Sequence, residues 1–233
     1  KRALKFLFGP GNYWQFEQIM SLEKLHGRTS IWNFYGGKGG IWRPIKELIL
    51  DPAYDVKSER LSRQLKKLRE QQHKIGLHPK FSTWRNSALM RLEKQRVEET
   101  LGEKIVHIRQ HWLRFSFAET WKSQSEAGFS HDLTLGFNDR SGFRNSCAMT
   151  FVDPSSKMMV TPTVLMDSHL FDYNILSKSE RRKRIDFYIE ELTDTGGEAS
   201  VIWHQRVFHP DYSWGEDYAY FLKKMDDCGV INP

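Results

Sequence analysis

Short runs of β-branched and aromatic residues alternate along the chain with longer segments in which apolar residues recur at helical spacing. The runs that predict strands are Thr29–Tyr35, Lys74–His78, Lys104–Trp112, Asp132–Phe137, Thr161–Asp167 and Ser200–His204. The segments that predict helices are Tyr13–Leu25, Asp55–Gln72, Asn86–Leu101, Phe117–Ala127, Ser179–Asp194 and Trp214–Asp227. Strand followed by helix, repeated in this way, is typical of a parallel α/β sheet or an α/β barrel. We therefore expect one α/β domain over residues 1–233.

The helix boundaries carry local signals. Asp55 is placed to cap the first turn of its helix, and Gly102 and Gly196 follow the last apolar positions of two others. The glycine run from Gly36 to Gly40 follows a predicted strand and is expected to form a loop over a site.

Composition excludes several classes of protein. The net charge of +6 is modest, and the main basic runs lie on predicted helices, so we interpret them as solvated helix faces and expect no nucleic-acid partner. An apolar run long enough for a transmembrane helix is missing, and two cysteines cannot form a disulfide scaffold. The sequence also lacks a phosphate-binding glycine motif and a Gly-x-Ser-x-Gly elbow. The 13% aromatic content is high for a core of this size, which predicts rings on a binding surface.

Three histidines, His78, His111 and His204, end predicted strands just before a loop. In parallel α/β folds this edge is where sites assemble. One interpretation is a metal or acid–base site. The other is that each histidine is only a hydrogen-bonded residue at a strand end. The carboxylates that could complete a site are Asp132, Asp139 and Asp167.

In Lys104–Trp112 the alternation places His107, Arg109 and His111 on one strand face, which favours a wet cavity over helix packing. Arg144 has two interpretations: it clamps an acid or a sugar hydroxyl, or it pairs with Asp139.

The motifs occur in a recognisable order: Ile75–Pro79, Arg109–Leu113, Asp132–Arg144, Thr161–Pro162, Met166–Asp167 and Ile202–His204. Together they resemble a bacterial branch of the polysaccharide deacetylase-like proteins, which are related to carbohydrate esterase family four and the chitooligosaccharide deacetylases. The resemblance covers nearly the whole chain, from about Tyr13 to Met225.

The resemblance implies a distorted (β/α) barrel of about seven strands with a divalent metal, most often zinc, at its mouth. It also implies hydrolysis of N- or O-linked acetyl groups on an oligo- or polysaccharide. His78 matches the first histidine of the metal motif, Ser82 stands where the second is expected, and His111 is the replacement ligand.

The remaining implied roles concern catalysis and substrate. Arg109 matches the arginine that orients a catalytic carboxylate, and His204 matches the histidine that protonates the leaving group. The expected catalytic residues are His204, Arg109 and Asp132. The expected substrate-binding residues are Trp203, Trp112, Arg144, Asp139 and Asp167.

One expected motif is missing. An aspartate-containing first strand should precede Tyr13 and supply the general base and one metal ligand, but nothing in Lys1–Gly11 matches it. We therefore expect an N-terminally incomplete barrel of a soluble protein from the bacterial cytoplasm or cell envelope. The alternative is a degenerate barrel that binds glycans without cleaving them.

Overall fold

A computed structural model describes residues 13–40 and 42–231. The larger sheet has the order β1-β2-β3-β4-β6-β5, in which β1 to β4 and β6 run parallel and β5 pairs antiparallel with β6 at the edge. A smaller parallel sheet consists of β7 and β8. The strands are β1 (Ile31–Tyr35), β2 (Lys74–His78), β3 (His107–Ile108), β4 (His131–Asp132), β5 (Phe151–Val152), β6 (Met159–Val160), β7 (Thr163–Met166) and β8 (Ser200–Ile202).

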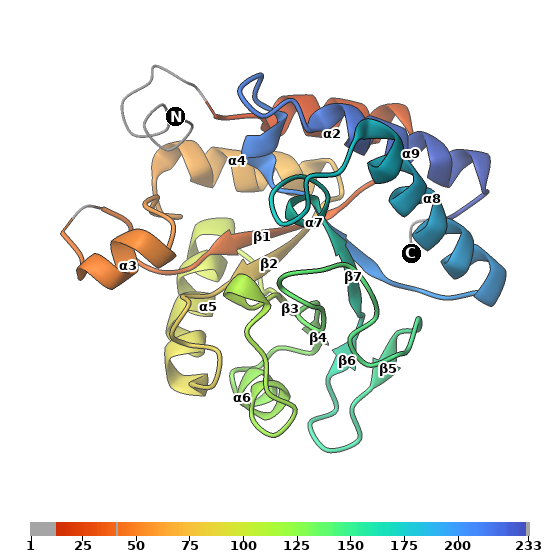
Figure 1. The fold of residues 1–233 in the computed structure, drawn as a ribbon. Helices are drawn as coiled ribbons and strands as arrows, with labels where there is room; N and C mark the ends of the chain where they lie inside the picture. Colours follow the sequence, from red (N-terminus) through yellow and green to blue (C-terminus); the bar gives the residue numbers. More distant parts are fainter. Residues whose placement is uncertain (1–12, 41, 232–233) are drawn as a thin grey trace.

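Helices cross between the parallel strands, as parallel pairing requires. They are α2 (Phe16–Leu25), α3 (Ile45–Leu50), α4 (Glu59–Glu70), α5 (Ser87–Leu101), α6 (Thr120–Glu126), α7 (Asp167–Phe171), α8 (Lys178–Thr195) and α9 (Gly215–Asp227). Two 3₁₀ turns, His111–Leu113 and Gln205–Phe208, follow β3 and β8. Figure 1 shows α3 at one side of the molecule, away from the other helices. We call residues 37–54 the α3 extension.

The core explains why these segments form these elements. In α4 the residues Leu61, Leu65 and Leu68 are buried at helical spacing, while charged residues occupy the rest of its surface. They join a cluster that lies between the larger sheet and helices α4 to α6. A second cluster connects α2 to α9, and a third lies between β7, α8 and α9. Together these clusters support the predicted mixed α/β fold with a parallel sheet.

The two sheets meet beside β4. The backbone N–H of Thr163 donates to Leu135 O at 2.8 Å, and the side chain of Thr163 donates to Leu133 O at 2.7 Å. The guanidinium of Arg109 reaches across to Ser200 Oγ at 2.6 Å. These contacts hold the smaller sheet against the carboxyl end of the larger one.

Several predicted boundaries are confirmed. Lys74–His78 is a strand with the expected bounds. Helix α5 ends at Gly102 with φ 88°, and α8 ends at Gly196 with φ 63°, a left-handed conformation that glycine adopts without steric cost.

Other predictions are wrong. Asp55 does not cap α4, because its carboxylate accepts from the backbone N–H of Lys57 and from Arg96, and the helix begins after Ser58. The strand expected over Lys104–Trp112 ends at Ile108, since the chain turns into a 3₁₀ helix at His111. The expected first strand upstream of Tyr13 lies outside the described residues and stays a prediction.

Candidate active site

The structure brings the three predicted histidines to one edge of the sheets. His78 ends β2, His111 opens the 3₁₀ turn after β3, and His204 follows β8. The rings of His78 and His111 lie 4.5 Å apart between centroids at an interplanar angle of 65°. His204 is close enough for its positive charge to lower the pKa of His78.

His78 is held in one tautomer. Its Nδ1 lies 2.8 Å from the backbone oxygen of Arg109, which can only accept, so Nδ1 carries the hydrogen. Burial, and then the charge of His111, keeps the pKa of His78 well below its usual value. The ring is therefore neutral at physiological pH, with the lone pair on Nε2.

His111 has a carboxylate partner that the sequence does not reveal. Its Nδ1 lies 3.1 Å from Oδ1 of Asp51, which also accepts from the backbone N–H of Phe81 at 2.7 Å. The Asp51 side chain is 3% exposed. Burial alone would raise the pKa of Asp51, but the hydrogen bonds from His111 and Phe81 outweigh it and lower the pKa. Asp51 lies 60 residues from His111, at the end of α3, so no local pattern could have paired them.

His204 is bound by Asp167. Its Nδ1 lies 2.8 Å and 3.0 Å from the two carboxylate oxygens, and its backbone N–H donates to Oδ2 at 2.7 Å. Asp167 is fully buried, and it also accepts from the backbone N–H of Ser168 at 2.7 Å. Burial would raise the pKa of Asp167, yet the charge and hydrogen bonds of His204 hold it below its usual value. With no exposed surface, the carboxylate orients His204, and the substrate contact expected of Asp167 stays a prediction.

Asp132 does not join the histidines. It is fully buried and accepts hydrogen bonds from Trp121 Nε1 at 3.1 Å, from Gln124 Nε2 at 2.8 Å and from the hydroxyl of Thr134. Burial raises the pKa of Asp132. Because Trp121 and Gln124 belong to α6, the carboxylate is enclosed between β4 and that helix. The structure therefore does not bring Asp132 to the histidines, and its catalytic role stays a prediction.

Arg109 is partly buried between the two sheets. Besides Ser200, its guanidinium donates to Leu133 O at 3.2 Å. Burial lowers the pKa of Arg109 to about 10. No ion pair to a carboxylate is formed by Arg109 within the described residues, so its predicted role of orienting a catalytic carboxylate stays a prediction.

The other predicted binding residues are dispersed. Trp203 is partly buried against Tyr218, with ring centroids 5.2 Å apart. Asp139 is exposed and lies 3.5 Å from Arg140, and it forms no ion pair with Arg144 within the described residues. Arg144 donates to Gly136 O at 3.2 Å.

Trp112 is an exposed ring beside His111. It is 45% exposed, and its centroid lies 6.4 Å from that of His111. Its backbone φ is 59°, and that of Leu113 is 49°, a left-handed pair that is strained for non-glycine residues. Ser82, where the family motif places a second histidine, is exposed in the turn after β2.

The donor chemistry fits two ligands of a metal ion. His78 and His111 each bind a protein oxygen through Nδ1, which leaves two Nε2 atoms as donors and matches the way ligating histidines are usually held. Within residues 13–40 and 42–231, however, no three histidine, cysteine, aspartate or glutamate side chains are grouped as a metal ion needs. A third ligand is thus not supplied by the part of the chain that the structure describes.

Comparisons with known proteins agree with the fold. No family model matches the sequence, and no curated protein matches it. A polysaccharide deacetylase from Bacillus cereus superposes with a TM-score of 0.52 at 16% identity, covering 95% of this chain and 84% of that one.

Two further solved structures are assigned as polysaccharide deacetylases. The one from Mycobacterium smegmatis gives a TM-score of 0.64 at 13% identity and covers 93% of this chain and 71% of its own. The one from Pseudomonas aeruginosa PAO1 gives a TM-score of 0.56 at 11% identity and covers 97% of this chain and 71% of its own. The chain therefore has the α/β fold of the polysaccharide deacetylases, as the motif resemblance predicts.

Proposed function

We propose that this protein is a metal-dependent hydrolase that removes acetyl groups, N- or O-linked, from a carbohydrate. The observation that carries the proposal is the placement of His78 and His111, both with free Nε2 atoms, beside a His204–Asp167 pair. The shared fold and the substrate class in the names of the similar structures support it.

His78 and His111 would hold a divalent ion, zinc most readily, through their Nε2 atoms. When bound, such an ion supplies Lewis-acid activation of water and of the acetyl carbonyl. Each imidazole is oriented by its Nδ1 partner, Arg109 O for His78 and Asp51 for His111.

His204 serves as the general acid. Because Asp167 binds Nδ1, Nε2 is the ring nitrogen that can hold a proton for the substrate. In the reaction water adds to the acetyl carbon, the bond from that carbon to the sugar nitrogen or oxygen breaks, and the sugar takes the proton from Nε2. The proton that the added water loses passes to solvent, from which His204 is reprotonated as acetate leaves. Asp167 remains ionised and holds the His204 ring in place during this transfer.

The test is acetate release from acetylated oligosaccharides by zinc-loaded protein, with and without a chelator. We expect chelation to abolish release, His78→Ala to lose both metal and activity, and His204→Ala to lose activity while it retains metal. The matched control is His131→Ala, because His131 begins β4 and lies at the opposite end of the strands. If acetate release persists in chelator, the proposal is wrong.

A second function is favoured by one observation. The described residues offer two metal ligands but no uncommitted carboxylate base, since Asp51 is bound by His111, Asp167 is bound by His204 and Asp132 is enclosed. A barrel that binds glycans without cleaving them would show the same features. Metal analysis separates the two, because the hydrolase retains one equivalent of metal per chain and the binding protein does not.

A further inference from the structure

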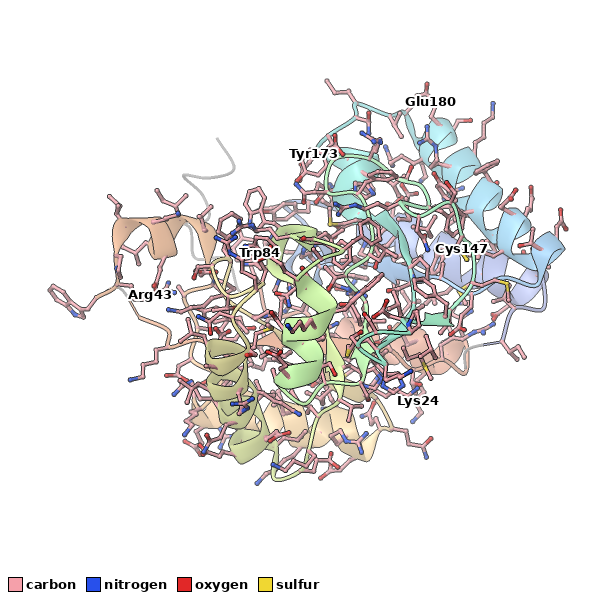
Figure 2. All side chains as sticks on the ribbon, turned by 90° about the horizontal axis from the view of Figure 1, so that it is seen from below. Lys24, Arg43, Trp84, Cys147, Tyr173 and Glu180 are labelled. Carbon is pink, nitrogen blue, oxygen red and sulfur yellow. The ribbon has the colours of Figure 1, made fainter. Side chains whose placement is uncertain are left out.

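Aromatic rings and guanidinium groups meet beside His111. The Arg114 guanidinium lies over Phe81 at 4.2 Å and over Trp84 at 5.0 Å, and Arg85 lies 5.2 Å from the same Trp84 ring. Trp112 meets Phe81 edge to face, with centroids 6.2 Å apart. We call Phe81, Trp84, Arg85, Trp112 and Arg114 the Arg114 cluster. Trp84 lies toward the same side of the molecule as Arg43 of the α3 extension (Figure 2).

The Arg114 cluster is continuous with the candidate active site. Phe81 donates its backbone N–H to Asp51, the partner of His111, and Arg114 donates to Phe81 O at 2.8 Å. Trp112 follows His111 directly and is 45% exposed. The Arg114 cluster therefore borders His111 and its carboxylate partner.

Positive charge in the Arg114 cluster is poorly compensated. Burial and the charge of Arg85 lower the pKa of Arg114, and no carboxylate contributes to that shift. Phe81 O is the one acceptor that the described residues give to Arg114. Arg85 lies 3.9 Å from Glu119, and this pair is 61% and 47% exposed, so it is weak.

The nearby carboxylates are already engaged. Asp51 is bound by His111 and by the backbone of Phe81, and Glu47 lies 2.8 Å from the Lys80 ammonium. Two guanidinium groups of like charge therefore share aromatic faces without an anion between them. An incoming anion would relieve this repulsion, and guanidinium groups bind carboxylate and phosphate through paired hydrogen bonds.

We propose that the Arg114 cluster binds an anionic group carried by the acetylated glycan, so that the substrate class is an acidic sugar chain. Trp112 stacks on a sugar face while Arg114 and Arg85 bind a carboxylate or a phosphate. This inference rests on the proposed deacetylase function for the acetyl group, but the anion site is measured independently of turnover.

The experiment compares matched probes by calorimetric titration in the presence of a chelator, so that no probe is hydrolysed. One pair is an O-acetylated tetragalacturonate and its carboxyl-reduced form, and the other is N-acetylglucosamine 1-phosphate and N-acetylglucosamine. We expect the acidic member of at least one pair to bind about tenfold or more tightly than its neutral partner, as charge-assisted hydrogen bonds allow. The pair with the larger ratio identifies carboxylate or phosphate as the anion.

Variants test the assignment to these residues. Arg114→Gln and the more exposed Arg85→Gln should each reduce the acidic-to-neutral ratio, whereas Arg63→Gln should preserve it. Arg63 is the matched control, because it is an exposed arginine on α4 that pairs with Glu59. Melting temperatures show whether each variant folds. If Arg114→Gln does not fold, the acidic-to-neutral affinity ratio of Arg85→Gln tests the proposal.

Equal affinities within both probe pairs would overturn the proposal, as would an Arg63→Gln effect as large as that of Arg85→Gln. Equal acetate release from acidic and neutral substrates would overturn it as well and leave the deacetylase function standing. Preferential binding of the acidic probes by a protein that releases no acetate would support the anion site and overturn the deacetylase function.

Discussion

Replacing Asp167 by asparagine tests whether the buried carboxylate controls His204. In the native site Oδ2 accepts the backbone N–H of His204 at 2.7 Å, and Oδ1 accepts Ser168 N–H at 2.7 Å and lies 2.8 Å from His204 Nδ1. An asparagine keeps the shape but has one acceptor oxygen and one NH₂ group. Whichever way the amide is turned, its NH₂ faces at least one backbone N–H.

The cost follows from this mismatch. A buried backbone N–H left without an acceptor costs about 1–3 kcal/mol, and hydrogen bonds to charged groups are worth about 1.5–3 kcal/mol. We therefore expect Asp167→Asn to lower the free energy of unfolding by about 2–4 kcal/mol at pH 7. Loss of an oriented general acid should also reduce kcat by about 10²- to 10⁴-fold.

The pH dependence has a definite sign. The pKa of Asp167 in the folded protein lies below the unfolded value of 3.8, so its stabilising contribution is complete above that value and is lost as pH falls through the folded pKa. The variant lacks this contribution, so the stability difference between the two proteins should shrink in acid.

Urea unfolding from pH 3 to pH 8, together with initial rates of acetate release, measures both effects. The control is Asp227→Asn, because Asp227 is 56% exposed and pairs with Lys223 on the same helix. An Asp167→Asn protein as stable and as active as the wild type would refute the reasoning, since a carboxylate that orients His204 cannot be dispensable.

Three further predictions concern stability and binding. Burial raises the pKa of Glu93 from 4.5 to about 7, so the wild type should lose about 3 kcal/mol of stability between pH 4.5 and pH 7 from this group. Urea unfolding of Glu93→Gln should lack that decline, and an unchanged pH profile would contradict the assignment. Burial, then the charges of His131 and Lys74, lower the pKa of His107 from 6.5 to about 4, so this group should make stability rise between pH 4 and pH 6.5. Thermal melts of His107→Gln should show a smaller rise in stability over this pH range than those of the wild type. A rise as steep as in the wild type would contradict the lowered pKa of His107. In Trp112→Gly calorimetric glycan affinity should fall because the exposed ring is lost, while relief of the left-handed φ of 59° offsets part of the lost packing against Phe81; a variant with unchanged affinity would exclude stacking on Trp112.

The sequence was sufficient wherever local chemistry decides the structure. Strand β2 follows from a short apolar run that ends at His78, and the ends of α5 and α8 follow from Gly102 and Gly196. His78, His111 and His204 could be selected because strand ends converge in parallel folds. Periodicity also predicted the buried face of α4.

What the sequence could not supply depends on tertiary contacts. Asp51 lies in the α3 extension, 60 residues before its partner His111. Ile45 and Ile49 of the same extension are 77% and 74% exposed, so a periodic pattern of buried residues does not reveal this segment in the sequence. Asp132 looked catalytic by its position at a strand end, but the pleat turns its side chain toward Trp121 of α6. The strand containing His107 stops early because the backbone turns left-handed at Trp112, which residue type alone does not predict.

No helix among residues 13–40 and 42–231 is long and apolar enough to cross a membrane.

The most direct test of the central claim is the acetate released per chain from an acetylated oligosaccharide as zinc is titrated in. The account predicts that release rises with zinc occupancy and saturates at one equivalent, that His78→Ala abolishes zinc retention, and that His204→Ala retains zinc without releasing acetate. Release that does not depend on zinc occupancy, or an active His204→Ala protein, would contradict it.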